Sequence, residues 1–182
     1  EGRFYNLSIP NFVRHRQARD RIPIYLGVVS PYMVRMAGRI ADGVLGHVTC
    51  TRSYFRKVVL PALGRGANET GRAIAEIDPA LSVLTVIDRD GNQARRDAAS
   101  WLTFYYVSKV FHGILDFHGW SEEKAAIVRA FRSMDPAAMS AAISERMWGE
   151  VLALARTPDE VREQWREIAK LSRHIVLLAP AP

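Results

Sequence analysis

The segment that best suits ligand binding is the turn between residues 27 and 31, Gly-Val-Val-Ser-Pro. An apolar run at residues 22–29 predicts a buried strand, and Ser30-Pro31 is a typical helix start, with serine as N-cap and proline at the first helical position. A strand that leads directly into a helix gathers free backbone N–H groups and the positive end of the helix dipole at one place. The sequence therefore predicts a phosphate-binding turn here. The alternative is that Ser30 only caps the helix.

A second group of candidate residues follows the short apolar run at residues 44–48, where His47, Thr49 and Cys50 stand close together. A lone histidine at a strand end is more often a hydrogen-bonded structural residue than a functional one. Cys50 has no base beside it in the sequence, so an activated nucleophile is not expected there.

Further along the chain, aromatic residues gather at helical spacing, which favours core packing: Trp101, Phe104, Tyr105, Tyr106 and Phe111. His112, Asp116 and His118 follow, but their spacings match no zinc or iron site, and we expect no metal. The chain also lacks the glycine-rich nucleotide loops, the nucleophile elbow and the zinc-protease motif.

The elements that would position these residues alternate between strands and helices. Strands are predicted at residues 22–29, 44–48, 81–87 and 174–178, and residues 93–173 are predicted to be almost wholly helical. Each predicted strand is apolar on both faces, which is typical of a parallel sheet covered by helices. Four such strands leave long unpaired edges, so we expect either a small open sheet or half of a sheet that closes.

Composition narrows the classes of protein further. The 182 residues are 48% apolar and 24% charged, as in ordinary globular domains, and no stretch approaches the roughly 20 apolar residues of a membrane-spanning helix. The net charge is +6, but the one dense basic run, at residues 14–21, has no interleaved aromatic residues, so no nucleic-acid partner is expected. A single cysteine excludes an internal disulfide and favours a cytoplasmic location.

Several segments, in the right order, resemble the luciferase-like monooxygenase family. They are IPIYLGVVSP at residues 22–31, AGRIADGV at 37–44, YFRKVVLPALGRG at 54–66 and TPDEV at 157–161. The chain is most similar to the branch that uses the deazaflavin coenzyme F420, which includes the methylenetetrahydromethanopterin reductases.

The resemblance implies an α/β fold that forms the C-terminal half, strands five to eight, of a TIM (β/α)8 barrel, with an extra helical insertion before the last strand. Such barrels typically have about 250 residues. We therefore expect residues 1–182 to be a single partial domain, obtained as a fragment or a truncated product.

The resemblance also implies roles for individual residues. The cofactor would be contacted near its phosphate by Gly27, Val28, Val29 and Ser30, although many deazaflavin-dependent members have glycine where this chain has Ser30. The substrate pocket would include His47, Thr49, Tyr105 and Tyr106. No residue is assigned a catalytic role.

The implied activity is hydride transfer between reduced F420 and a small organic substrate. The alternatives are an FMN-dependent monooxygenase of the same fold, a catalytically inert half-barrel, or a module that binds a phosphate-bearing ligand. We expect a small-molecule substrate, no nucleic-acid or membrane partner, and assembly either as a homo-oligomer or with the missing N-terminal half.

Overall fold

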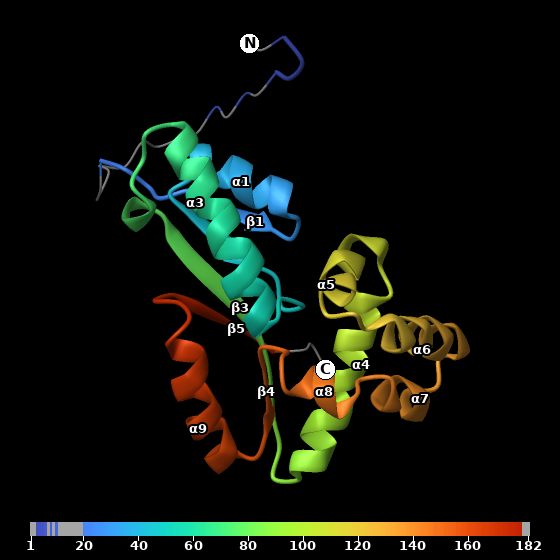
Figure 1. The fold of residues 1–182 in the computed structure, drawn as a ribbon. Coiled ribbons are helices and arrows are strands. Elements are labelled where there is room, and N and C mark those ends of the chain that lie inside the picture. The colour runs from blue at the N-terminus through green and yellow to red at the C-terminus, as the bar shows by residue number, and fades with distance from the viewer. Residues whose placement is uncertain (1–2, 7, 9, 11–19, 180–182) are drawn as a thin grey trace.

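A computed structural model describes residues 3–6, 8, 10 and 20–179 of the chain (Figure 1). Most of the basic run at residues 14–21 lies outside the described residues. Among the described residues, no helix combines the length and the apolar character that crossing a bilayer requires.

The centre of the fold is a parallel sheet of five strands: β1 (Tyr25–Val28), β2 (Gly43–Gly46), β3 (Asp78–Ile87), β4 (Ala153–Arg156) and β5 (Ile175–Leu178). β1 pairs with β2, β2 with β3, and β3 with β5, every pair in parallel. The four strands predicted from the sequence are therefore confirmed as parallel neighbours in chain order. Their ends differ from the prediction, since the first begins at Tyr25 and the third extends back to Asp78.

β3 is long enough to hold two strands end to end along one edge. Leu81 pairs with both Gly46 of β2 and Ile175 of β5, so these two strands lie on opposite sides of β3. Leu84 likewise pairs with both Ala153 of β4 and Leu178 of β5. β4 therefore continues the line of β2, while β5 follows the other edge.

The prediction that residues 93–173 are almost wholly helical was wrong at β4. This strand reads Ala-Leu-Ala-Arg, and alanine and leucine are strong helix formers without the β-branched side chains typical of strands. Pairing with Leu84–Ile87 of β3 makes it a strand. The strand conformation of β4 therefore depends on a partner about 70 residues away in the sequence rather than on local propensity.

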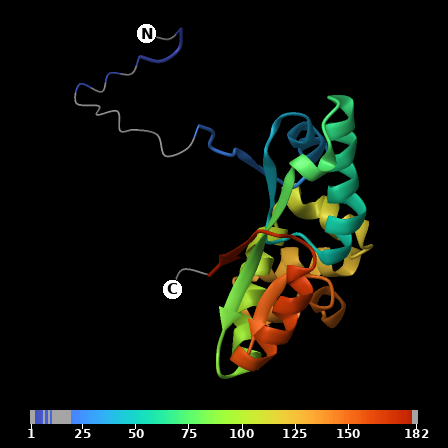
Figure 2. The same cartoon turned by 90° about the vertical axis from the view of Figure 1, so that its left-hand side faces the viewer.

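Helices cover one face of the sheet. α1 (Pro31–Ile40) and α3 (Leu60–Glu69) lie on that side together, and α9 (Pro158–Ala169) lies beside β4 (Figure 2). α2 (Arg52–Tyr54) and a π-helical turn (Phe55–Val59) lead into α3, and a 3₁₀ turn (Ile74–Glu76) precedes β3. The predicted start of α9 is confirmed, since Thr157 and Glu160 form a reciprocal capping box.

Two glycines allow α1 and α3 to pack at close range. A Cβ atom on Gly38 would lie 2.4 Å from the Leu63 carbonyl oxygen, and one on Gly66 would lie 2.0 Å from the Arg35 carbonyl oxygen. Any larger residue would have to push the helix backbones apart. This contact holds α1 in place and thereby fixes the turn at its N-terminus.

The predicted helical insertion before the last strand is confirmed. It contains α4 (Gly91–Tyr106), a 3₁₀ turn (Lys109–Phe111), α5 (His112–Phe117), α6 (Ser121–Ser133), α7 (Pro136–Ala141) and α8 (Glu145–Trp148). These helices lie on the opposite side of β4 from α9 (Figure 1). Glu123 of α6 is 7% exposed and accepts hydrogen bonds from Arg146 and Ser144, which joins α6 to α8.

Candidate functional site

The face of the sheet opposite α1 and α3 is open. We call it the open face, and its residues alternate along the strands with those buried beneath the helices. In register, it carries Tyr25 and Gly27 of β1 beside Gly43 and Leu45 of β2, and Ser82 of β3 beside Val176 of β5. Tyr25, Gly27 and Val176 are exposed, whereas Val28, Val44 and Leu81 on the other face are buried.

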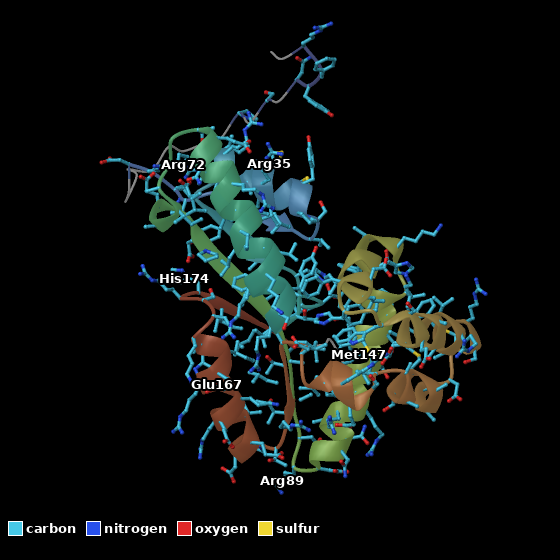
Figure 3. The ribbon with its side chains drawn as sticks, in the orientation of Figure 1. Arg35, Arg72, Arg89, Met147, Glu167 and His174 are labelled. Carbon is cyan, nitrogen blue, oxygen red and sulfur yellow. The ribbon has the colours of Figure 1, made fainter. Side chains whose placement is uncertain are left out.

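At the N-terminal end of the strands, side chains already occupy the open face. The Tyr25 ring lies over Gly43, and its hydroxyl donates to Asp78 Oδ2 at 2.6 Å. The same carboxylate oxygen lies 2.5 Å from His174 Nδ1, at the start of β5 and far from α4 and α5 (Figure 3). The hydrogen bond to Asp78 raises the pKa of Tyr25. This end is linked across three strands, so a ligand site is better sought at the carboxyl end.

The carboxyl end of β1 is the turn that contains Ser30. Ser30 Oγ accepts a hydrogen bond from the Met33 N–H at 3.3 Å, and its carbonyl accepts one from the Val34 N–H at 3.1 Å. The capping role of Ser30 is therefore confirmed. Capping uses a lone pair of the hydroxyl, so its proton stays available to a ligand.

The turn also has room and a donor for an anion. Pro31 has no N–H, and the N–H groups of Met33 and Val34 bond to Ser30. Within the described residues, Tyr32 therefore supplies the one first-turn N–H group without an acceptor. A Cβ atom on Gly27 would meet no atom within 4 Å, so space is open beside the turn. From the other side, the Tyr54 hydroxyl donates to the Val29 carbonyl at 3.4 Å and holds the turn. These groups fit one phosphate.

At the carboxyl end of β2, two aromatic rings enclose the imidazole of His47. The Phe111 ring stacks on it, with centroids 4.6 Å apart, and the Tyr105 ring meets it edge-on at 4.8 Å. We call these three residues the rim cluster. Partial burial lowers the pKa of His47, so the imidazole is neutral at physiological pH.

Thr49 and Tyr106 lie behind the rim cluster rather than on its surface. Both are fully buried, and the Tyr106 hydroxyl donates to the Thr49 carbonyl at 2.7 Å. Burial raises the pKa of Tyr106, so its phenol stays protonated. Of the four residues expected in the substrate pocket, His47 and Tyr105 keep exposed surface, and Thr49 and Tyr106 fix the loop behind them.

The sequence prediction missed a second link between this loop and the helical insertion. Thr51 Oγ1 lies 2.7 Å from His118 Nε2 and also accepts the Tyr54 N–H, while the His118 ring stacks on Trp120 at 4.0 Å. Burial is the main reason that the pKa of His118 is lowered. Thr51 was recognisable as a helix N-cap, but no sequence signal pairs it with His118, 67 residues away.

The structure also bears on the Cys50 thiol and on a metal site. Cys50 is buried, and burial raises the pKa of its thiol to about 12, so no thiolate forms at neutral pH. Within the described ranges, no group of three or more histidine, cysteine or acidic side chains could hold a metal ion.

Comparison with known proteins identifies the relatives of this chain. The family model for luciferase-like monooxygenases matches residues 1–174. The 5,10-methylenetetrahydromethanopterin reductase of Methanopyrus kandleri is 33% identical over 172 residues, which is 93% of this chain and 48% of that protein. The F420-dependent glucose-6-phosphate dehydrogenase of Nakamurella multipartita is 32% identical over 101 residues, which is 56% of this chain and 29% of that protein.

A solved structure gives the same result. The coenzyme F420 dependent tetrahydromethanopterin reductase from Methanopyrus kandleri matches with a TM-score of 0.70 and 29% identity, over 87% of this chain and 45% of that one. This chain thus spans about half the length, or less, of the relatives that it matches.

Proposed function

The chain belongs to the luciferase-like monooxygenase family, and from this premise we propose that it is part of an F420-dependent oxidoreductase. The proposed reaction is hydride transfer between reduced F420 and a small organic substrate. The observation that carries the proposal is the Ser30 turn, whose hydroxyl and free N–H suit one phosphate, in a chain whose named relatives depend on F420. The turn itself would serve FMN equally well, and the names of the relatives favour F420 over this alternative.

The described residues would bind and orient the ligands. When bound, the deazaflavin would supply or accept the hydride. Ser30 and the Tyr32 N–H would hold its phosphate at the N-terminus of α1, and Gly27 would leave space for it beside the strand. His47 and Tyr105 would border the substrate side at the end of the neighbouring strand. Both groups lie at the carboxyl ends of parallel strands, where barrel enzymes place their active sites.

We further propose that residues 1–182 form one partial domain, the second half of a barrel. β1, β2, β3 and β5 would be barrel strands five to eight, and β4 would belong to the insertion. In support, the residues of β5 after Ile175 are all exposed, as expected for a strand that a closed barrel would cover. Either the first half or a second copy of the chain would cover it. A cytoplasmic location stays a prediction based on the single cysteine.

Two substitutions at Ser30 test the phosphate site. Asparagine and aspartate are both good N-caps, so Ser30→Asn and Ser30→Asp should leave α1 capped and the melting temperature nearly unchanged. Only aspartate places a negative charge against the phosphate. We expect F420 to bind Ser30→Asp at least tenfold more weakly than the unsubstituted chain, and Ser30→Asn within about threefold of it.

Fluorescence titration with F420 measures these affinities, with FMN titrated in parallel. Because the proposed pocket is only half present, we expect a dissociation constant no better than high micromolar, about −5 to −6 kcal/mol. Equal F420 affinities of the Ser30→Asp and Ser30→Asn variants would reject the phosphate site. Submicromolar binding to the chain alone would reject the half-barrel, and tighter binding of FMN would favour the monooxygenase alternative.

A further inference from the structure

The hydrogen bonds of His47 determine where its proton lies. The backbone N–H of Thr49 donates to His47 Nδ1 at 3.3 Å, and Thr49 Oγ1 lies 3.1 Å from the same nitrogen. A backbone N–H can only donate, so Nδ1 must be the acceptor and carries no proton. A neutral imidazole then carries its proton on Nε2.

The surroundings of the ring preserve this tautomer. Phe111 and Tyr105 hold the plane of the imidazole, and a proton on Nδ1 would point at the Thr49 N–H, so the Nε2–H tautomer is favoured. The Thr49 N–H is itself fixed, because the Thr49 side chain is buried and its carbonyl accepts the buried Tyr106 hydroxyl. The histidine is thus held as a hydrogen-bond donor by Thr49 and Tyr106, which are both buried behind the rim cluster.

The Nε2–H group has no partner within the described part of the chain. His47 is half-buried, and its Nε2 atom remains accessible to solvent. A donor that is fixed by its neighbours, accessible and unpaired is suited to binding an acceptor from outside the chain.

Apolar surface extends from the rim cluster. Tyr105 lies next to Trp101 and Phe104, with ring centroids 6.2 and 5.4 Å away, and Phe104 is 52% exposed. Trp101 and Phe104, together with Ser100, line an apolar hollow of about 240 Å³ on α4. A molecule that reaches His47 would therefore also meet aromatic side chains.

We propose that His47 is the specificity-determining donor of the proposed substrate site, and that its Nε2–H binds a carbonyl or carboxylate oxygen of a small, otherwise apolar organic substrate. The inference deepens the proposed function by naming the substrate class, and it rests on that function only for the reaction. A substrate of this class presents an oxygen to Nε2–H and its hydrocarbon part to Tyr105 and Trp101.

NMR on chain labelled with ¹⁵N-histidine tests the tautomer directly. Long-range ¹H–¹⁵N correlations distinguish the two neutral forms, and loss of one set of signals in His47→Gln identifies His47. We expect an unprotonated Nδ1 and a protonated Nε2. A proton on Nδ1 would overturn the inference without affecting the F420 proposal, which depends on Ser30.

Three probes with the same phenyl ring test the ligand class: acetophenone, benzoate and toluene. We expect acetophenone and benzoate to shift the His47 Nε2 signal at lower concentrations than toluene does. His47→Gln keeps an N–H donor at a similar distance from the backbone and should retain the affinity for acetophenone, whereas His47→Phe keeps only a ring and should lose about three- to tenfold. Equal binding of toluene and acetophenone would overturn the proposal, as would unchanged acetophenone affinity in a His47→Phe variant with an unchanged melting temperature.

Discussion

At the scale of single residues, two adjacent side chains in α4 make different contacts. Tyr105 contributes a half-buried ring to the rim cluster, while Tyr106 is fully buried and gives its hydroxyl to the Thr49 carbonyl. The helical spacing of the aromatic residues favoured core packing for the whole group, and Tyr106 packs in this way, whereas Phe104 is 52% exposed. The spacing gives no indication that the loop carbonyl of Thr49 is the acceptor, because that contact joins residues 57 positions apart.

Removing the Tyr106 hydroxyl should therefore destabilise the fold. In Tyr106→Phe the buried Thr49 carbonyl loses its partner, and we expect the free energy of unfolding to fall by about 1–3 kcal/mol. Tyr105→Phe is the matched control, since the described structure gives the Tyr105 hydroxyl no hydrogen bond, and it should change stability by less than about 0.5 kcal/mol. Urea unfolding at one fixed protein concentration measures both variants, and equal effects would contradict the assigned role.

The ion pair between Glu123 and Arg146 makes a prediction that depends on pH. Hydrogen bonds from Arg146 lower the pKa of Glu123 from its ordinary value of 4.5 to about 2. Because the carboxylate form is favoured in the folded state, its stabilisation is present above pH 4.5 and is lost as the pH falls toward 2. Glu123→Gln should lower the free energy of unfolding by about 1.5–3 kcal/mol at pH 7.

The difference between the unsubstituted protein and Glu123→Gln should shrink steadily below pH 4.5. Glu167→Gln serves as the control, because the side chains of Glu167 and Lys170 in its ion pair are 50% and 64% exposed and the pair should contribute little to stability. Thermal unfolding followed between pH 7 and pH 3 gives both curves. A Glu123→Gln difference that does not vary with pH would show that the charge of Glu123 is not what stabilises α6 against α8.

At the scale of elements, local signals predicted the parts of the fold whose cause is local. Ser30-Pro31 and Thr157-Pro158 indicated the starts of α1 and α9, and apolar runs indicated the four strands that lie side by side. β4 was missed because its alanine and leucine residues favour a helix, and only β3 makes them a strand. The Ser30 turn was predictable for the same local reason, whereas the rim cluster depends on contacts of His47 with Tyr105 and Phe111, about 60 residues away along the chain.

The packing of α1 on α3 gives a prediction that can be controlled within one helix. Gly66→Ala would place a methyl group 2.0 Å from the Arg35 carbonyl oxygen, and the backbones must separate. We expect the free energy of unfolding of Gly66→Ala to fall by about 1–3 kcal/mol or more. Gly64→Ala, two residues away in α3, meets no atom within 4 Å and should stabilise the helix by about 0.5–1 kcal/mol. Melting temperatures that move in the same direction for both variants would contradict the close approach of the helices.

At the scale of the whole molecule, β1 and β5 lie at edges of the sheet, as β4 also does. Within the described residues, β1 pairs with β2 alone and β5 with β3 alone, so each has one edge without a strand partner. β5 also exposes apolar side chains, with Val176 at 47%, Leu177 at 52% and Leu178 at 38%. Exposed edges with apolar side chains favour association with another chain.

We therefore predict that the isolated chain does not remain a monomer. Each apolar side chain that becomes fully buried gains about 1.5–3 kcal/mol, so covering β5 and the open face is favourable whether a second copy or the proposed first half of a barrel covers them. Sedimentation velocity at micromolar concentration should give a mass above the 20.5 kDa of one chain. Val176→Lys combined with Leu178→Lys places two charges on the open face and should shift the chain toward monomer. Ile40→Lys replaces an apolar side chain that is 70% exposed at the end of α1, and should leave the mass unchanged. A folded, stable monomer of the unsubstituted chain would show that neither the open face nor the strand edges need a partner, and would remove the support for a half-barrel.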